Sequence, residues 1–381
     1  QLSVHLKARY IMTHRHTFTF IFVLIIVLIS FGLTWPWLFN LAGDAQVHLA
    51  VAEQFSRGQP FQFNPSGEIV TASTSPFWTI ILTLCFTLVG ASAPLLLKII
   101  CVIAWTTTGY LLYRVAREVW RIPSVALLAM LGWWLTSTTI ISNALAGMEN
   151  ILSALQLLLI YYLSVKWHGH LSDRRSVILG LIWGWAILTR PDGGLFGTIV
   201  IGLLLASESL SQRPVKFAIR LKQLGLLSSA ALVIVVPWYV YQFQLAGKLV
   251  TDSSIARLYA GRQGSIPILD GILYLYPKAL VSLGAAFLPV MIGTIFLTGT
   301  YGLGLLRINQ GKRRFLVDNY RQIIAVSIVA VGLIFYSFVV GAESFGRYFL
   351  PIFPFLFLCG IAGLQRLDEH VQRRMKIRSP A

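Results

Sequence analysis

The chain has 381 residues, of which 56% are hydrophobic and only 12% charged, and its mean hydropathy is +0.73. This composition indicates a helical protein that crosses a membrane many times. The formal net charge of +17 does not indicate a nucleic-acid partner, because the basic residues gather in short loops between apolar runs. The three cysteines lie in apolar segments without paired spacing, so neither a disulfide framework nor a metal knuckle is indicated.

The first expected element is a membrane span over 18–39, a run of 22 residues without a charge. At about 1.5 Å per residue this run is long enough to cross a hydrocarbon core of about 30 Å. It is also too long for the apolar region of a signal peptide. Further spans are expected at 95–113, 123–141, 150–165, 176–189, 193–207, 224–243, 279–306, 323–341 and 348–364. The predicted class is an all-α polytopic bundle of about ten transmembrane helices.

The apolar run 76–89 is short for a span, and it decides the orientation of every later loop. If this run does not cross, 23 Lys and Arg residues lie on the cytoplasmic side and 8 outside. If it crosses, the distribution becomes 10 inside and 21 outside, which contradicts the positive-inside rule. We therefore expect a juxtamembrane or re-entrant helix along the outer face.

This topology defines the expected organisation of the chain. A cytoplasmic tail over 1–17 precedes a transmembrane domain over 18–366, and a basic cytoplasmic tail follows over 367–381. The domain contains a first extracytoplasmic loop over 40–94 and a long loop over 244–278, and no separate soluble catalytic domain is expected. Eight acids fall outside or at the outer membrane edge, so any chemistry is expected there: Asp44, Glu53, Glu68, Glu149, Asp192, Asp252, Asp270 and Glu343.

Asp44 lies a few residues beyond the first span, in the sequence GDAQVHLAVAEQF. The apolar residues of this stretch can form one side of an interfacial helix that holds the carboxylate against the membrane surface. The alternative is an N-cap, because Asp before a helical stretch commonly accepts backbone N–H bonds. His48 and Glu53 are interpreted as solvated helix residues rather than metal ligands.

Four other polar clusters lie at the outer ends of predicted spans. Their ionisable residues are Lys98, Glu149 in GMEN, Arg190 and Asp192 in RPDGG, and Glu343 and Arg347 beside the last span. Each has a structural alternative: Glu149 suits the first turn of a helix, and Arg190 and Asp192 suit a turn closed by a local ion pair. Ionisable groups at membrane depth cost about 2.5–3.5 kcal/mol and usually face the interior of the bundle. Together they suit a substrate with a phosphate, hydroxyl groups and an apolar tail, such as a lipid-linked phosphosugar.

The chain resembles the GT-C superfamily of polytopic glycosyltransferases that use polyprenyl-phosphate sugars. The resemblance is carried by GDAQVHLAVAEQF, TSPFW at 74–78, GMEN at 147–150 and RPDGG at 190–194, in this order over roughly residues 18–350. It is nearest to the bacterial branch that contains terminal arabinofuranosyltransferases and related mannosyltransferases. Gly43 stands where that family often has a first Asp, so Asp44 is the available carboxylate of the first motif.

The resemblance implies an inverting glycosyltransferase of the plasma membrane, with Asp44 as general base toward an extracytoplasmic glycan, lipid or protein acceptor. Cations would stabilise the departing polyprenyl phosphate, and the candidates are Lys98, Arg190, Arg257, Arg262 and Arg347. Glu149, Asp192 and Glu343 would bind the substrate or orient these cations. No metal or cofactor is expected besides the lipid-phosphate sugar donor, because a phosphate leaving group needs less help than a diphosphate.

Two alternatives come from other classes of protein. A transporter or flippase of a lipid-linked saccharide also needs many spans and polar groups near a lipid phosphate. Transporters, however, commonly show internal repeats and polar residues near the bilayer midplane, whereas the polar clusters of this sequence lie at span ends. The other alternative is a non-catalytic membrane scaffold, and Gly43 is the feature that suggests it.

Overall fold

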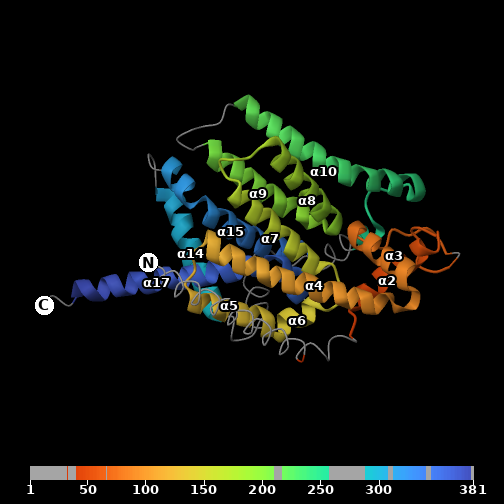
Figure 1. The fold of residues 1–381 in the computed structure, drawn as a ribbon, viewed down its shortest axis with the longest axis horizontal. Helices are drawn as coiled ribbons and strands as arrows, with labels where there is room; N and C mark the ends of the chain where they lie inside the picture. The colour runs from red at the N-terminus through yellow and green to blue at the C-terminus, as the bar shows by residue number, and fades with distance from the viewer. Residues whose placement is uncertain are drawn as a thin grey trace, which may run out of the picture.

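The computed structural model describes residues 40–65, 67–209, 217–256, 288–307, 312–339 and 345–378, together with Gly32. Nearly all of this part is helical, and its only extended pairing is an isolated bridge between Gln62 and Ile69 (Figure 1). The predicted all-α class is confirmed. The remainder of the first expected span and most of the long loop lie outside the described residues.

Most expected spans coincide with described helices. The elements are α2 (Gly43–Ser56), α3 (Pro76–Val89), η1 (Gly90–Ser92), α4 (Ala93–Arg114), η2 (Val115–Val119), α5 (Ser124–Thr136), α6 (Thr138–Ala144), α7 (Asn150–Lys166), α8 (Asp173–Thr189), α9 (Pro191–Ser209), α10 (Phe217–Ala246), α14 (Leu288–Arg307), α15 (Lys312–Val339), α16 (Phe345–Phe349), η6 (Leu350–Ile352) and α17 (Phe353–Arg378). The last helix continues well beyond the expected span, so the basic segment after 366 is helical as far as Arg378.

Within the described residues, five helical stretches are long and apolar enough to cross a membrane. The number becomes six if the bent pair α5 and α6 forms one span, while α7 is a shorter apolar helix. These helices confirm a membrane-spanning protein. The count of about ten spans stays a prediction.

The expected span over 123–141 is not one straight helix, because the structure breaks it into α5 and α6, which are bent by 54°. Whether the bent pair crosses as one span stays a prediction. Ser137 lies between them in an extended conformation, with φ −66° and ψ 117°. It belongs to a run of hydroxyl residues over 136–139, and such side chains compete for backbone hydrogen bonds and weaken a helix.

Helix α3 begins and ends at the same end of the bundle. Near its start, Trp78 Nε1 donates to the carbonyl oxygen of Gly147 at 3.3 Å. Just after it, Lys98 in the second turn of α4 donates to the carbonyl oxygens of Asn40 and Leu145. Helices α2 and α3 therefore lie together beside the start of α4 (Figure 1). This is the arrangement expected of a helix that does not cross, and the membrane face on which it lies stays a prediction.

The loops expected on the cytoplasmic side meet at the opposite end of the bundle. Arg321 donates to the carbonyl oxygen of Val119 at 3.3 Å, and Arg220 donates to Glu208 at 2.5 Å. Nearby, His168 is hydrogen-bonded to Ser207 at 3.0 Å. The described molecule thus has two polar ends joined by apolar helices.

Glycines set the closest helix packing. A Cβ added at Gly184 of α8 would lie 2.8 Å from the carbonyl oxygen of Ala231 on α10, and one at Gly180 would overlap the carbonyl of Leu227. A Cβ at Gly293 of α14 would likewise overlap the carbonyl of Gly360 on α17. Small residues let membrane helices approach closely, which is where their association energy arises.

Candidate active site

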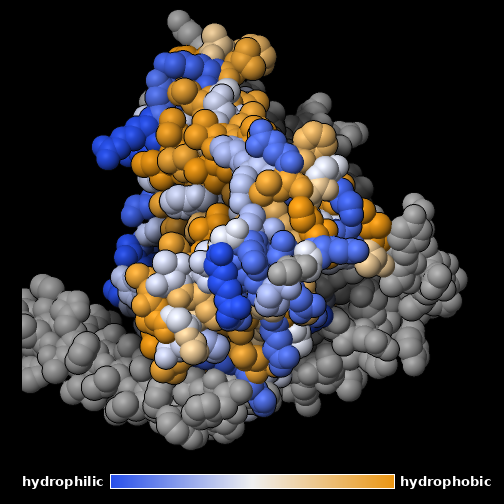
Figure 2. Space-filling view, turned by 90° about the vertical axis from the view of Figure 1, so that its right-hand side faces the viewer, coloured by the Kyte–Doolittle hydropathy of each residue, from blue (hydrophilic) through white to orange (hydrophobic). Residues whose placement is uncertain are grey.

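Polar side chains from α2, α7, the α8–α9 turn, α15 and α16 converge at the end of the bundle where α2 and α3 lie. Figure 2 turns this end toward the viewer and shows hydrophilic residues gathered among hydrophobic ones. Five of the predicted site residues meet here: Asp44, Glu149, Arg190, Asp192 and Arg347. Of the other four, Lys98 lies beside the site, and Arg257, Arg262 and Glu343 lie outside the described residues.

Arg190 is the centre of the cluster, and only 6% of it is exposed. Its Nε lies 3.0 and 3.2 Å from the two oxygens of Asp192, and its Nη2 donates to Asp192 Oδ2 at 2.9 Å. Its Nη1 donates to Glu149 Oε1 at 3.3 Å and to Asn150 Oδ1. The predicted local ion pair with Asp192 is therefore present, but it is one part of a larger buried network.

Two tyrosines complete the surroundings of this network. The Tyr336 hydroxyl of α15 donates to Asp192 Oδ2, and the Tyr348 ring of α16 lies 5.2 Å from the guanidinium carbon of Arg190. A guanidinium against an aromatic face gains a cation–π attraction. Arg190 is thus fixed by groups from α7, α9, α15 and α16.

The sequence RPDGG explains the position of Arg190. A residue before proline is pushed toward extended geometry, and Arg190 has φ −152° and ψ 136°. This ends α8, and Pro191 begins α9, where its missing N–H has no cost. A Cβ at Gly193 would overlap the carbonyl of Ala186, so this turn requires a glycine.

The motifs TSPFW and GMEN meet at Gly147. This glycine has φ +82°, and a Cβ there would lie 2.7 Å from Leu41 Cδ2 and 3.1 Å from Ala45 Cβ. Its carbonyl accepts the bond from Trp78, and the N–H of Ala42 donates to the Ala146 carbonyl at 2.9 Å. These contacts hold the start of α2 beside the start of α7.

Asp44 lies within the first turn of α2, whose N-cap is Ala42, so the N-cap alternative is wrong. Its Oδ2 lies 2.9 Å from Arg347 Nη2, and the two side chains are 39% and 23% exposed, respectively. The guanidinium of Arg347 lies 5.1 Å from the same Tyr348 ring that Arg190 contacts. Asp44 is therefore the most accessible of the three site carboxylates.

His48 is not the solvated residue expected from the sequence, since only 5% of it is exposed. Its Nε2 lies 3.6 Å from Glu149 Oε2, and its Nδ1 is hydrogen-bonded to Ser73 Oγ at 3.0 Å. The spacing of Asp44 and His48 puts both on one helix face. The solvated interpretation suits Glu53, which forms an exposed pair with Arg57 at 2.5 Å.

Lys98 is buried beside the site, where its ammonium group binds the carbonyl oxygens of Asn40 and Leu145. It thereby holds the segments that precede Asp44 and Glu149. The sequence interpretation did not include Asn150, Tyr336 and Tyr348. Asn150 is the last residue of GMEN and Tyr348 follows Arg347, so their positions beside predicted site residues could have identified both. Tyr336 lies in an apolar span, away from any motif.

A second link fixes the first loop from outside the site. The N–H and hydroxyl of Thr71 donate to Asp252 Oδ2 at 3.0 and 2.9 Å, and Asp252 also pairs with Lys248 at 2.7 Å. The hydrogen bond from Lys248, followed by those from Thr71, lowers the pKa of Asp252. The loop is thus attached to the segment after α10.

The site carboxylates face guanidinium groups rather than one another. Within the described ranges, no group of three or more His, Cys, Asp and Glu residues is arranged to hold a metal ion. The three cysteines, Cys85, Cys101 and Cys359, are buried and free.

The fold and site together define a helical membrane protein with a buried charge cluster at one end of its bundle. Residues 73–241 match a family profile described as dolichyl-phosphate-mannose-protein mannosyltransferase. This range includes TSPFW, GMEN and RPDGG but ends before Tyr336 and begins after Asp44. No curated protein matches the chain significantly in sequence.

Solved structures match over most of the chain. ArnT from Cupriavidus metallidurans bound to undecaprenyl phosphate is 15% identical, with a TM-score of 0.57 over 91% of this chain and 60% of ArnT. The Archaeoglobus fulgidus oligosaccharyltransferase in complex with zinc and sulfate is 16% identical, with a TM-score of 0.52 over 92% of this chain and 50% of its own. The chain thus spans about half to three-fifths of these proteins. The predicted fold is confirmed by these matches, while membership of the GT-C superfamily and its arabinofuranosyl or mannosyl branch stays a prediction.

Proposed function

We propose that the chain is an integral-membrane inverting glycosyltransferase that transfers a sugar from a polyprenyl-phosphate donor to a hydroxyl group of an extracytoplasmic glycan, lipid or protein. The observation that carries this proposal is the accessible Asp44–Arg347 pair beside the buried Arg190 cluster. The mannosyltransferase profile and the fold of ArnT, which was solved with undecaprenyl phosphate, support it.

In the proposed step, the acceptor oxygen attacks the anomeric carbon while Asp44 takes the hydroxyl proton. The bond from the anomeric carbon to the phosphate oxygen breaks, and polyprenyl phosphate leaves with the electron pair. Since attack and departure occur on opposite faces, the configuration inverts. General-base assistance of this kind contributes about 10²–10⁴-fold. The accessibility of Asp44 supports its choice over Glu149 and Asp192, which are buried against Arg190.

Arg347 suits the leaving phosphate, because it is partly exposed and adjoins the proposed base. A guanidinium group can bind two phosphate oxygens at once and stabilise the charge that develops there. Arg190 is already held by three side-chain partners, so we assign it to positioning, with Glu149 and Asp192 orienting it or binding sugar hydroxyls. Lys98 positions the backbone at Asn40 and Leu145, just before Asp44 and Glu149. Arg257, Arg262 and Glu343 are retained as candidates for substrate binding.

We propose no metal or cofactor besides the donor. Each described site carboxylate lies within ion-pair distance of a guanidinium group, with Glu149 and Asp192 sharing Arg190, and we assign the stabilisation of the leaving phosphate to Arg347. The proposed place of the enzyme is the plasma membrane, with both termini in the cytoplasm and the site outside, since this agrees with the positive-inside rule.

The test is release of polyprenyl phosphate from a panel of polyprenyl-phosphate sugars by the purified chain in lipid, with candidate acceptors added. We expect the native chain to release it with one donor, and Asp44→Asn to be slower by about 10²-fold or more. Glu53→Gln is the matched control, because Glu53 is an exposed, ion-paired carboxylate on the same helix, and it should retain activity.

Normal release by folded Asp44→Asn would contradict the role of Asp44. Absence of release with every donor and acceptor, from protein shown to be folded, would favour the transporter or scaffold alternative.

A further inference from the structure

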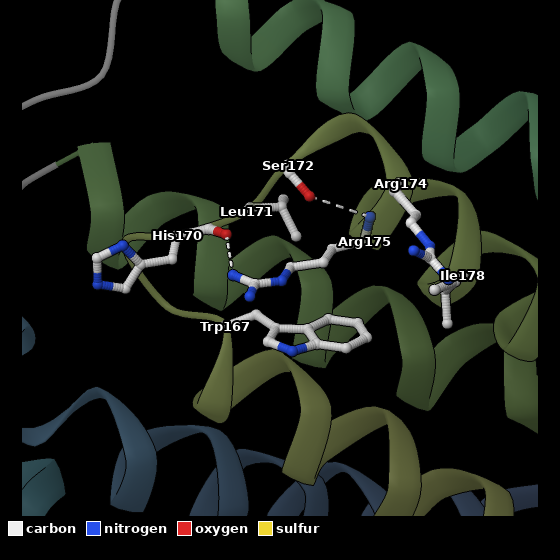
Figure 3. Close-up of a pocket in the computed structure, with 7 residues that line it drawn as sticks. All are labelled: Trp167, His170, Leu171, Ser172, Arg174, Arg175 and Ile178. Atoms are coloured by element: carbon white, nitrogen blue, oxygen red, sulfur yellow. Dashed lines mark hydrogen bonds between the residues drawn. The ribbon is translucent and has the colours of Figure 1, made fainter.

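A second polar feature lies at the opposite end of α8 from Arg190. The 17 residues of α8 separate the two by roughly 25 Å at 1.5 Å per residue. Here the turn between α7 and α8 forms an open pocket of about 810 Å³, shown in Figure 3. Its lining residues are Trp167, His170, Leu171, Ser172, Arg174, Arg175 and Ile178.

The pocket contains two arginines that no described carboxylate compensates. Arg175 is fixed in place: its backbone N–H donates to Ser172 Oγ at 3.4 Å, its Nη1 donates to the His170 carbonyl at 2.5 Å, and its guanidinium carbon lies 5.6 Å from the Trp167 ring. Arg174 is exposed and makes no side-chain hydrogen bond or ion pair within the described part of the chain.

Two acids on the adjoining segments, Asp173 and Glu208, are paired with other cations. Asp173 pairs with Lys222 at 2.6 Å. Glu208 accepts from Arg220 at 2.5 Å and from the Gly169 N–H at 2.7 Å. The pocket therefore carries a net positive charge, to which the N-terminus of α8 adds a partial positive charge.

The other wall of the pocket is apolar and is formed by Trp167, Leu171 and Ile178. A charged rim beside an apolar wall suits a ligand with an anionic head and a hydrocarbon tail. Basic pockets between membrane helices on the cytoplasmic side bind anionic lipid headgroups, and the Lys166–Arg175 loop is predicted on that side.

We propose that this pocket binds the phosphate headgroup of an anionic phospholipid of the surrounding membrane. Arg174, whose side chain extends beside Ile178 (Figure 3), contacts the phosphate, and Arg175, which is held toward His170, adds positive charge across the pocket. The start of the acyl chain packs on Ile178 and the Trp167 ring. The site is distinct from the candidate active site and does not depend on the proposed catalysis.

The test uses the purified, delipidated full chain and native mass spectrometry. The probes are a phosphatidylglycerol, a phosphatidylcholine with the same acyl chains, and inorganic phosphate as a free anion. We expect phosphatidylglycerol to bind more tightly than phosphatidylcholine, and excess inorganic phosphate not to displace it. Arg174→Gln should weaken phosphatidylglycerol binding by about fivefold, the effect of one arginine near an anionic surface.

Arg174→Gln is informative because its side chain has no described partner to lose, so folding should be preserved, and a melting curve checks this. Arg175→Lys keeps the charge but loses the planar contact with Trp167, so an intermediate loss is expected. Arg117→Gln is the matched control, since Arg117 is an exposed arginine at the same end whose Nη1 donates to Tyr113. It should bind like the native chain.

Equal binding of the two lipids, or unchanged binding by folded Arg174→Gln, would overturn the proposal. Displacement of the lipid by inorganic phosphate would overturn it too, because the site would then take a free phosphate.

Discussion

Arg190 shows how a membrane protein can keep two acids buried. Glu149 and Asp192 are nearly inaccessible, and an unpaired carboxylate in such a place would be costly. Breaking a buried ion pair by removing one partner typically costs about 3–5 kcal/mol, because it leaves an uncompensated charge. The network is therefore as much a requirement for folding as a candidate for substrate binding.

Replacing Arg190 by Met should lower the free energy of unfolding by about 3–5 kcal/mol, since two buried carboxylates lose their cation. Thermal unfolding in a fixed detergent measures the effect. Arg57→Met is the control, because its pair with Glu53 is exposed, and a change below about 1 kcal/mol is expected there. An unchanged melting temperature for Arg190→Met would contradict this account of the network.

Gly147 makes a second prediction at the residue scale. Gly147→Ala should destabilise the chain by more than about 1–2 kcal/mol, because it adds a Cβ at positive φ and against Leu41. Gly132→Ala in α5 adds its Cβ to open space and should be neutral or slightly stabilising. Comparison of the two melting curves tests the requirement; equal effects would refute it.

At the scale of elements, α2 and α3 depend on links to distant segments for their position. One link is the Trp78 bond to Gly147, and another is the Thr71 contact with Asp252. The second link contains a titratable group, the carboxylate of Asp252 in the segment after α10. The attachment of the first loop to that segment should therefore respond to acid.

Because the pKa of Asp252 is lowered, its contribution to stability is complete above the ordinary value of about 3.9. It is lost as the pH falls through the lowered pKa, when the carboxylate is protonated. Hydrogen exchange at the Thr71 amide, corrected for intrinsic rates, should show protection at pH 5 that declines below about pH 4. In Asp252→Asn the protection should be weak and independent of pH; protection that rises in acid would contradict the link.

At the scale of the whole molecule, charged residues occupy two ends of an apolar bundle. This arrangement predicts opposite accessibility across the membrane. In intact cells, a membrane-impermeant maleimide should label Arg57→Cys but label Lys222→Cys only after permeabilisation, since both side chains are exposed. The buried native cysteines should not react. The reverse labelling pattern would show that the predicted orientation is inverted.

Hydropathy predicted most helices, because apolar length alone determines which segments can lie in lipid. It did not predict the break at Ser137, where the competition between side-chain and backbone hydrogen bonds is local and leaves hydropathy almost unchanged. The motifs predicted the acids and arginines of the cluster, since these residues lie at span ends on the same side of the predicted topology. Tyr336 and the burial of His48 depend on which helix faces pack together, which neither hydropathy nor motif spacing specifies.

Gly180 and Gly184, where α8 packs closely against α10, have a consequence for sequence variation. On the side of α10 that faces away from α8, exposed residues such as Val233, Val236 and Val240 can exchange with other apolar residues at little cost. At Gly184 the smallest possible change, one methyl group, would press on the backbone of Ala231 and separate the helices. Related sequences should therefore vary freely on the exposed side of α10. They should retain glycine or another small residue at the α8 positions that pack against its other side.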